Sequence, residues 1–427
     1  MKSKTKLLSL ASVVALGLVS CTNDELKEIY SGEEITFTTK VSRATPTTLK
    51  ELDGFRVYAD ADGYSKLFIN GLMARKKSTG SGDYELESKI TWPVDVNRIS
   101  FWAYGPENVN IKPNFTGQTQ TLSDFTVASD MVNGGKDHKD LVVAYTRAER
   151  DNTSGMQVPL VFRHALSQIE VKIKKGDGYE EGRIVKVKGA WIVNVDSEGE
   201  FIFGKDPNDY LKWRTQTLSN YGRTLSEGTK LGEGVDMISN EDGGNNSSLM
   251  LLPQTFNKYV FENLMEASDV SSSARDSKPG AYILVLCRVE TEHKFDATDN
   301  DTAVGPLYGS DGTTVVGHVH QLFPVTSDAS GRHTFKADAY GYSCVPIEGT
   351  WMPGKKYVYT LEFCGRNSGA GVYPPEPLPD GIPEGEKRPD DKRPGDPVLD
   401  DPITFSVTVS DWVSNDNPQE DLETPMN

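Results

Sequence analysis

Apolar and polar residues alternate along most of this chain. In segments such as 169–174 and 357–363 every second side chain is apolar, and those between are mostly charged or hydroxylated. A period of two is typical of strands with one buried face. Wholly apolar runs such as 141–145 are typical of strands buried on both faces. Because no amphipathic helical stretch longer than about three turns stands out, we predict an all-β protein built from β-sandwiches.

Changes in composition divide the chain. The 427 residues allow two or three domains. A Gly- and Asp-rich break follows the strand at 169–174, so we expect one sandwich over 44–178 and a second over 179–365. Residues 374–402 contain nine prolines among charged residues, and we expect 366–402 to form an extended, semi-rigid linker. Residues 403–427 then hold one strand and a polar tail.

The first 21 residues have the pattern of an export signal. Lys2, Lys4 and Lys6 precede an apolar run over 7–18, which is too short for a good membrane span. The run ends in Leu-Val-Ser-Cys, which resembles the bacterial lipobox and predicts a lipidated Cys21. An ordinary secretory signal that happens to contain a cysteine is the alternative interpretation.

Two strand-like segments near the ends of the chain resemble each other. Residues 35–42 and 403–410 are identical at five of eight positions. Each segment alternates, with an apolar face formed by Ile35, Phe37 and Val41 in the first and by Ile403, Phe405, Val407 and Val409 in the second. An isolated strand has no hydrophobic partner of its own. We therefore interpret the two segments as interchangeable occupants of one groove, with chance similarity as the alternative.

Several passages resemble the fimbrillins of the Bacteroidota, the pilins of type V pili. They lie at 140–145, 158–169, 251–254 and 354–361, in order between the lipobox and the closing Val-Ser-Asp-Trp at 409–412. The resemblance implies two transthyretin-like β-sandwiches and a lipoprotein precursor anchored in the outer membrane, with acidic residues after Cys21 directing it to the cell surface.

The same resemblance implies how the protein matures. It implies a cut between Arg43 and Ala44 that makes 22–43 a propeptide strand, whose place a C-terminal strand of a neighbour then takes. The implied partners are other fimbrillin subunits in a fimbrium and ligands on host or bacterial surfaces. The alternative is a surface lipoprotein that binds glycans and does not polymerise.

Charge and motifs limit other functions. The formal charge of −17 repels phosphate backbones, so no nucleic-acid partner is expected. No GxSxG, HExxH or phosphate-binding loop occurs, so we expect no enzyme, catalytic residue or cofactor. Beyond Cys21, the three remaining cysteines (Cys287, Cys344 and Cys364) allow at most one internal disulfide.

Few residues have the spacing of metal ligands. His318 and His320 would lie on one face of a strand, but no third ligand is evident nearby. Asp296, Asp299 and Asp301 do not match a calcium loop, and His164 has the surroundings of a structural, hydrogen-bonded histidine. We expect no metal site.

Overall fold

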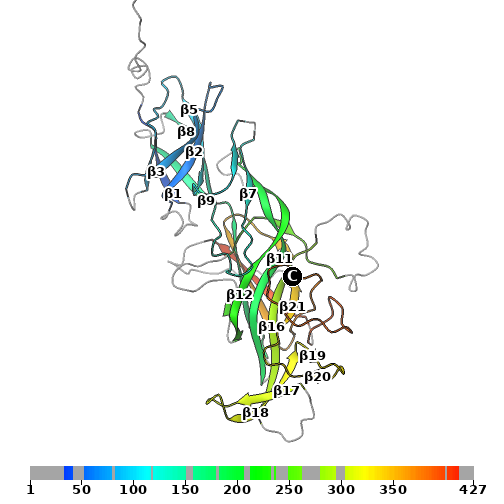
Figure 1. Cartoon of the computed structure of the whole chain (residues 1–427). Coiled ribbons are helices and arrows are strands. Elements are labelled where there is room, and N and C mark those ends of the chain that lie inside the picture. The colour runs from blue at the N-terminus through cyan, green and yellow to red at the C-terminus, as the bar shows by residue number, and fades with distance from the viewer. Residues whose placement is uncertain are drawn as a thin grey trace, which may run out of the picture.

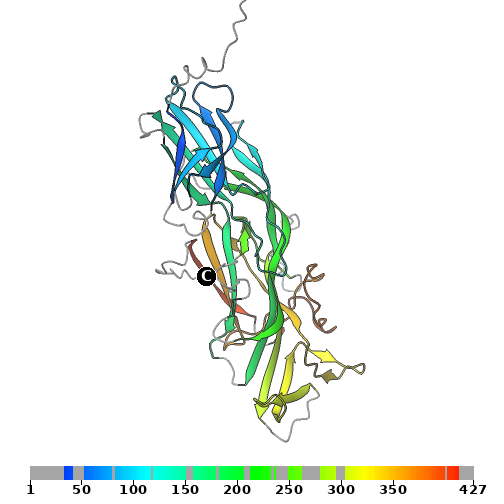
Figure 2. The ribbon, with the colours of Figure 1, turned by 60° about the vertical axis from the view of Figure 1, so that its left-hand side comes forward.

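The structure is a computed structural model that describes residues 33–41, 52–78, 82–116, 119–150, 157–178, 182–205, 212–231, 235–236, 249–261, 279–294, 303–399 and 402–412. These residues form strands and no helix, which confirms the all-β prediction. The strands build an elongated molecule of two units, with β1 to β5 in the first and β11 to β24 in the second (Figures 1 and 2). None of the described residues belongs to a helix that could span a bilayer.

The first unit is a closed barrel of seven strands. Around the barrel the order is β1 (Thr36–Val41), β4 (Asp83–Leu86), β3 (Ile69–Lys76), β2 (Gly54–Ala61), β5 (Arg98–Gly105), β8 (Val142–Glu149) and β9 (Gln157–His164). Alternate apolar side chains turn inward and form one core, which includes Phe55, Phe101 and Phe162. Because β1 closes the ring, the described strands of this unit leave no free sheet edge.

The second unit contains one large and one smaller sheet. The large sheet runs β17 (Val304–Tyr308), β18 (Val315–Phe323), β16 (Tyr282–Lys294), β11 (Arg183–Ile202), β7 (Thr121–Thr126) and β6 (Lys112–Asn114), with β12 (Lys212–Lys230) beside β11 and β21 (Gly341–Pro346) beside β16. The smaller sheet runs β13 (Val235–Asp236), β10 (Ser167–Lys175), β23 (Lys355–Phe363) and β24 (Thr404–Asp411), with β14 (Leu249–Leu251) beside β10. Two short pairs join β15 (Thr255–Phe256) to β22 (Gly349–Thr350) and β19 (Thr326–Ser327) to β20 (His333–Thr334).

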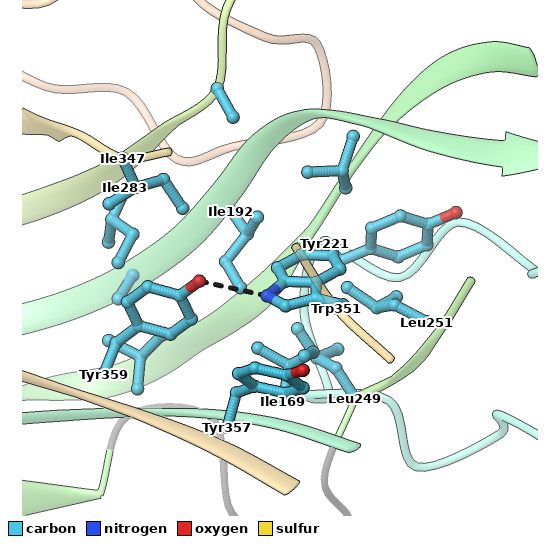
Figure 3. Packing of buried hydrophobic residues seen from close by; sticks show 14 of the residues in the cluster. Ile169, Ile192, Tyr221, Leu249, Leu251, Ile283, Ile347, Trp351, Tyr357 and Tyr359 are labelled. Atoms are coloured by element: carbon cyan, nitrogen blue, oxygen red, sulfur yellow. Dashed lines mark hydrogen bonds between the residues drawn. The ribbon is translucent and has the colours of Figure 1, made fainter. Parts of the chain in front are cut away.

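A single hydrophobic core joins the two sheets of the second unit. It combines Ile169 and Tyr359 of the smaller sheet with Ile192 and Ile283 of the large sheet, and all four side chains are buried. Trp351 is also buried, and its Nε1 donates a hydrogen bond to Tyr359 Oη at 3.0 Å (Figure 3). The indole N–H thereby has a partner inside an apolar region, where an unpaired donor would be costly.

The sheets divide at a different place from the boundary expected at 178. The chain leaves the barrel at His164, and β10, which starts at Ser167, already pairs with β23 in parallel. In addition, β7 pairs with β11 although it precedes two barrel strands in the sequence. Sequence alternation identifies strands but not their neighbours, and a Gly-rich turn after β10 therefore gave the wrong position for the change of sheet.

The proline-rich segment is not an extended linker, contrary to expectation. Val372 forms bridges with Cys344 and with Pro397, and Tyr373 is 3% exposed. Tyr342 Oη of β21 also donates a hydrogen bond to the carbonyl oxygen of Pro383. The segment folds against the large sheet because its few apolar side chains find partners there. Proline removes backbone donors, but the carbonyl groups and the remaining amides still form bridges.

The cysteines of the second unit form no disulfide. Cys287, Cys344 and Cys364 are all buried as free thiols. Cys287 belongs to the core between the sheets, whereas Cys344 belongs to a cluster with Trp191 and Tyr342. Although β16 and β21 are paired strands, these two thiols therefore lie on opposite faces of the sheet.

Candidate functional site: the groove around β1

The first described strand is inserted between two strands that do not pair with each other. β1 runs antiparallel to β4, with Thr36 opposite Glu85. On its other side β1 runs parallel to β9, with Thr36 opposite Gln157 and Phe37 opposite Val158. A parallel pair needs a long crossover connection, so β1 comes from a remote part of the chain to fill this position.

The inward face of β1 is fully buried. Ile35 is 1% exposed and Phe37 is 0% exposed. The Phe37 ring makes edge contacts with Phe55 and Phe101, with ring centroids 6.1 Å and 5.7 Å apart. Both side chains belong to the core of the barrel. The side chain of Val41 lies outside the described residues.

Hydrogen bonds hold both ends of β1. At its start, the Ile35 amide donates to the carbonyl of Ile90 at 2.8 Å, and the Trp92 amide donates to the carbonyl of Glu33 at 3.1 Å. Further along, the Thr39 amide donates to the carbonyl of Gly82 at 2.9 Å. The strand is therefore an integral part of the barrel.

A buried tyrosine lines the groove beside Phe37. Tyr84 of β4 is paired with Phe37 in register, and its Oη donates to the carbonyl of Leu52 at 2.8 Å. Burial and the neighbouring Asp53 carboxylate raise the pKa of Tyr84 to about 12, so its hydroxyl stays protonated at neutral pH. Removal of β1 would expose an apolar slot lined by these rings and unpaired edges on β4 and β9.

The strand near the C-terminus is bound much less completely. β24 lies at the edge of the smaller sheet, and among the described strands it pairs with β23 alone. Phe405, which aligns with Phe37, is 38% exposed, and Val407 and Val409 are partly buried against the core. Of the four predicted inward residues, Ile403 is buried, at 6% exposure.

The ends of β24 are fixed by two apolar contacts. Ile403 packs near Gly371 at one end. At the other end the Trp412 ring stacks on His164 with centroids 4.1 Å apart and ring planes 11° apart. His164 Nδ1 is 2.6 Å from Asp140 Oδ2, which confirms the structural role expected for this histidine.

Sequence reasoning missed the contact between Trp412 and His164. His164 is the last residue of β9, which forms one wall of the β1 groove, so the stack connects β24 to that wall. The signal in the sequence was a tryptophan directly after the alternating segment, but nothing there indicates its partner 248 residues earlier. Of the other predicted sites, Cys21, Arg43 and Ala44 lie outside the described residues, as do Asp296, Asp299 and Asp301.

Metal-ligand side chains are sparse in the described part of the chain, where no three His, Cys, Asp or Glu side chains gather in a way that could hold an ion. His318 and His320 lie on one face of β18, as predicted, with ring centroids 5.2 Å apart.

A sequence profile described as fimbrillin-like matches residues 42–278, which is more than half of the chain. The protein belongs to the fimbrillin-like family. The resemblance inferred from its sequence passages is therefore confirmed. A comparison with curated proteins gives no match.

Two of the solved structures that resemble this chain come from Bacteroides and Parabacteroides species. A fimbrial protein from Bacteroides vulgatus is 14% identical with a TM-score of 0.47, covering 90% of this chain and 100% of its own. A protein assigned to cell adhesion from Parabacteroides distasonis is 9% identical with a TM-score of 0.40, covering 91% and 99%. At this level of similarity neither structure adds to what the family match establishes.

Proposed function

We propose that this fimbrillin-like protein is a structural pilin that polymerises by strand exchange and supports adhesion of the cell that carries it. In this proposal β1 is a temporary occupant of the barrel groove, and β24 of a neighbouring subunit is its permanent replacement. The observation that carries the proposal is the contrast between two strands of similar sequence, one enclosed on both sides and one at a half-exposed edge.

Burial favours transfer of the donor strand. Phe405 is 38% exposed on its own subunit, whereas Phe37 in the groove is 0% exposed. Since full burial of a phenylalanine contributes about 2–3 kcal/mol, moving Phe405 into the Phe37 position gains about 1 kcal/mol from this ring alone. The groove also supplies two pairing strands where the edge of the smaller sheet supplies one.

Loss of β1 makes insertion of a new strand into the groove necessary as well as favourable. We propose that the lipidated precursor, anchored through Cys21 in the outer membrane, is cut between Arg43 and Ala44. The cut leaves β1 attached by pairing alone, with no covalent link to β2. Once β1 leaves, the barrel has two unpaired edges and an exposed aromatic slot, which only another strand repairs well.

The folded proline-rich segment changes how the subunits would meet. Because Tyr373 and Val398 are buried against their own subunit, the donor strand detaches after Leu399 rather than on a long tether. Residues 402–412 span at most about 36 Å when extended. The donating subunit must therefore lie directly against the barrel of its neighbour. Each contact joins two different surfaces and does not close on itself, so filaments result.

The test is deletion of residues 403–427 in the producing cell. We expect the shortened subunit to fold and reach the cell surface but to form no polymer, measured as the loss of ladders on gels run without boiling. Phe405→Asp provides a second variant, because a carboxylate would enter an apolar slot without a partner.

A matched control shows whether the effect of Phe405→Asp depends on the position of the new charge. Thr408→Asp lies on the same strand at a partly exposed position whose aligned residue in β1 is Lys40, so it should leave the ladders unchanged. Normal ladders from the deletion would overturn the proposal. So would surface-exposed, trimmed subunits that bind glycans but stay monomeric, which the alternative function predicts.

A further inference from the structure

The two ends of β24 differ in how they are attached. At its N-terminal end the strand continues from the folded proline-rich segment, and two hydrogen bonds hold it there. The Gly369 amide donates to the carbonyl of Pro402 at 3.2 Å, and the Thr404 amide donates to Ser368 Oγ at 2.8 Å. Because this end is also joined covalently to a segment that stays folded, separation of β24 from β23 starts at the other end, where Trp412 lies (Figure 2).

Trp412 is attached through both its ring and its backbone. Its ring stacks on His164, with centroids 4.1 Å apart, and the residue is 5% exposed. Its amide donates to the carbonyl of Gly354 at 3.0 Å, and the Gly354 amide donates to the carbonyl of Leu166 at 2.8 Å. These contacts connect the end of β24 to the turn before β23 and to the end of β9.

The His164 ring is held in place by contacts that do not involve Trp412. Its Nδ1 is 2.6 Å from Asp140 Oδ2, and both side chains are buried. The adjacent Ala165 amide donates to the carbonyl of Leu141 at 2.8 Å. Because these contacts set the orientation of the imidazole, the stacking surface for the indole is present before the indole arrives.

The same pair of side chains contains polar atoms without a partner. His164 Nε2 and Asp140 Oδ1 are buried and make no hydrogen bond to any of the residues that the structure describes. A buried polar group without a hydrogen bond is unfavourable, and contact with water relieves this. When the indole leaves, one face of the imidazole opens to water. This gain offsets part of the lost stacking, so the contact can hold β24 and still open.

Trp412 has no counterpart in the strand that β24 would replace. The similarity between the two segments covers 35–42 and 403–410. If the same alignment is continued, Trp412 corresponds to Ala44, which follows the cut proposed after Arg43. The alignment therefore requires no large ring at this position of the groove.

We propose that the stack of Trp412 on His164 is a latch that retains β24 on its own subunit and opens before the strand is donated. This inference rests on the strand exchange of the proposed function. The described structure is then the closed, unassembled state, in which β24 stays paired with β23. Retention keeps one edge of β24 paired and so limits premature pairing with other chains.

The experiment measures opening of β24 in the monomeric precursor, so it does not depend on polymer formation. Amide hydrogen exchange of β24 is followed by mass spectrometry in the full chain carrying Cys21→Ala. Trp412→Ala should raise the opening equilibrium of β24 about 100-fold or more, as expected for truncation of a buried tryptophan. Exchange in barrel strands such as β5 should stay unchanged, which shows that the variant is folded.

Two further variants make the test specific to the ring contact. His164→Asn keeps a donor for Asp140 but removes the ring, and it should raise the opening equilibrium as well. Combined with Trp412→Ala it should add little, because both substitutions remove the same contact. Asp411→Asn is the matched control, since it removes an exposed ion pair with Lys355 at the same end of β24. It should change opening less than about fivefold, because surface ion pairs contribute little.

Subunits cut after Arg43 supply the second readout, and those with Trp412→Ala should form ladders sooner than the parent. The latch is overturned if Trp412→Ala leaves exchange of β24 unchanged, or if Asp411→Asn raises it equally. It is also overturned if the effects of Trp412→Ala and His164→Asn simply add, or if ladders form no sooner despite faster exchange. Absence of ladders from the parent, together with the expected exchange, would contradict strand exchange while supporting retention of β24 by Trp412.

Discussion

Phe37 and Phe405 occupy equivalent positions in two similar strands. Truncation of each to alanine therefore separates the role of β1, which fills the groove in the precursor, from the role proposed for β24, which would fill it in the polymer. Phe37→Ala removes a ring that is 0% exposed and packed against Phe55 and Phe101. The barrel around it is closed and has little freedom to collapse into the space. Such a change in a core typically costs about 3–5 kcal/mol of unfolding free energy.

Phe405→Ala should lower the unfolding free energy of the monomeric precursor much less than Phe37→Ala does. With 38% of the residue exposed, about six-tenths of the full burial contribution is at stake, or about 1.5 kcal/mol. The edge position of β24 also lets solvent fill the space, so no closed cavity is left. In the polymer Phe405→Ala should be the more costly of the two substitutions, because Phe405 would then occupy the buried position.

Urea unfolding of the precursor measures how much unfolding free energy each substitution removes. Ladders on unboiled gels measure how much each substitution weakens the polymer. We expect Phe37→Ala to lower the unfolding free energy by at least about 1.5 kcal/mol more than Phe405→Ala does. This is the difference between the lower end of the range expected for Phe37→Ala and the value expected for Phe405→Ala. We also expect Phe405→Ala to weaken the polymer. Equal losses in the precursor, or unaffected polymers from Phe405→Ala, would refute the assignment of β24 as the strand that replaces β1.

Three other predictions concern maturation and the buried groups. Arg43→Ala should leave full-length lipidated monomers on the cell, seen by mass spectrometry of the subunit; normal trimming would place the cut elsewhere. Burial lowers the pKa of His138, whose Nδ1 accepts from the Met250 amide, so stability should fall as pH drops below about 6.5. In urea titrations at pH 7 and pH 5 this loss should be smaller in His138→Gln, by at most about 1.4 kcal/mol per pH unit, and an identical pH dependence would contradict the assignment. Burial raises the pKa of the Cys287 thiol to about 12, so the native protein should resist a thiol reagent that labels the unfolded chain, and rapid native labelling would contradict this.

The sequence was most informative where a local pattern sufficed. The alternation at 169–174 and 357–363 predicted β10 and β23, and the similar segments 35–42 and 403–410 contain β1 and β24. These features depend on which face of a strand is apolar, and that is encoded within a few residues.

Features that depend on distant partners could not be predicted in the same way. The proline-rich segment folds because Val372 meets Cys344, and no composition rule indicates that contact. The stack of Trp412 on His164 arises from strand order and register. Register is set by the whole sheet, so no pattern within a few residues indicates that Trp412 and His164 are neighbours.

An engineered cross-link tests most directly which strand fills the groove in the assembled fibre. Thr36 is opposite Glu85 in the barrel, and its aligned residue Thr404 is opposite Glu362 within its own subunit. Paired positions in an antiparallel ladder are close enough for a disulfide. On cells that produce Glu85→Cys/Thr404→Cys subunits, we expect oxidation to yield covalent ladders between subunits, whereas Glu362→Cys/Thr404→Cys should cross-link only within unassembled precursors. Monomeric Glu85→Cys/Thr404→Cys subunits after oxidation, in fibres that otherwise form normally, would contradict donation of β24 to the barrel.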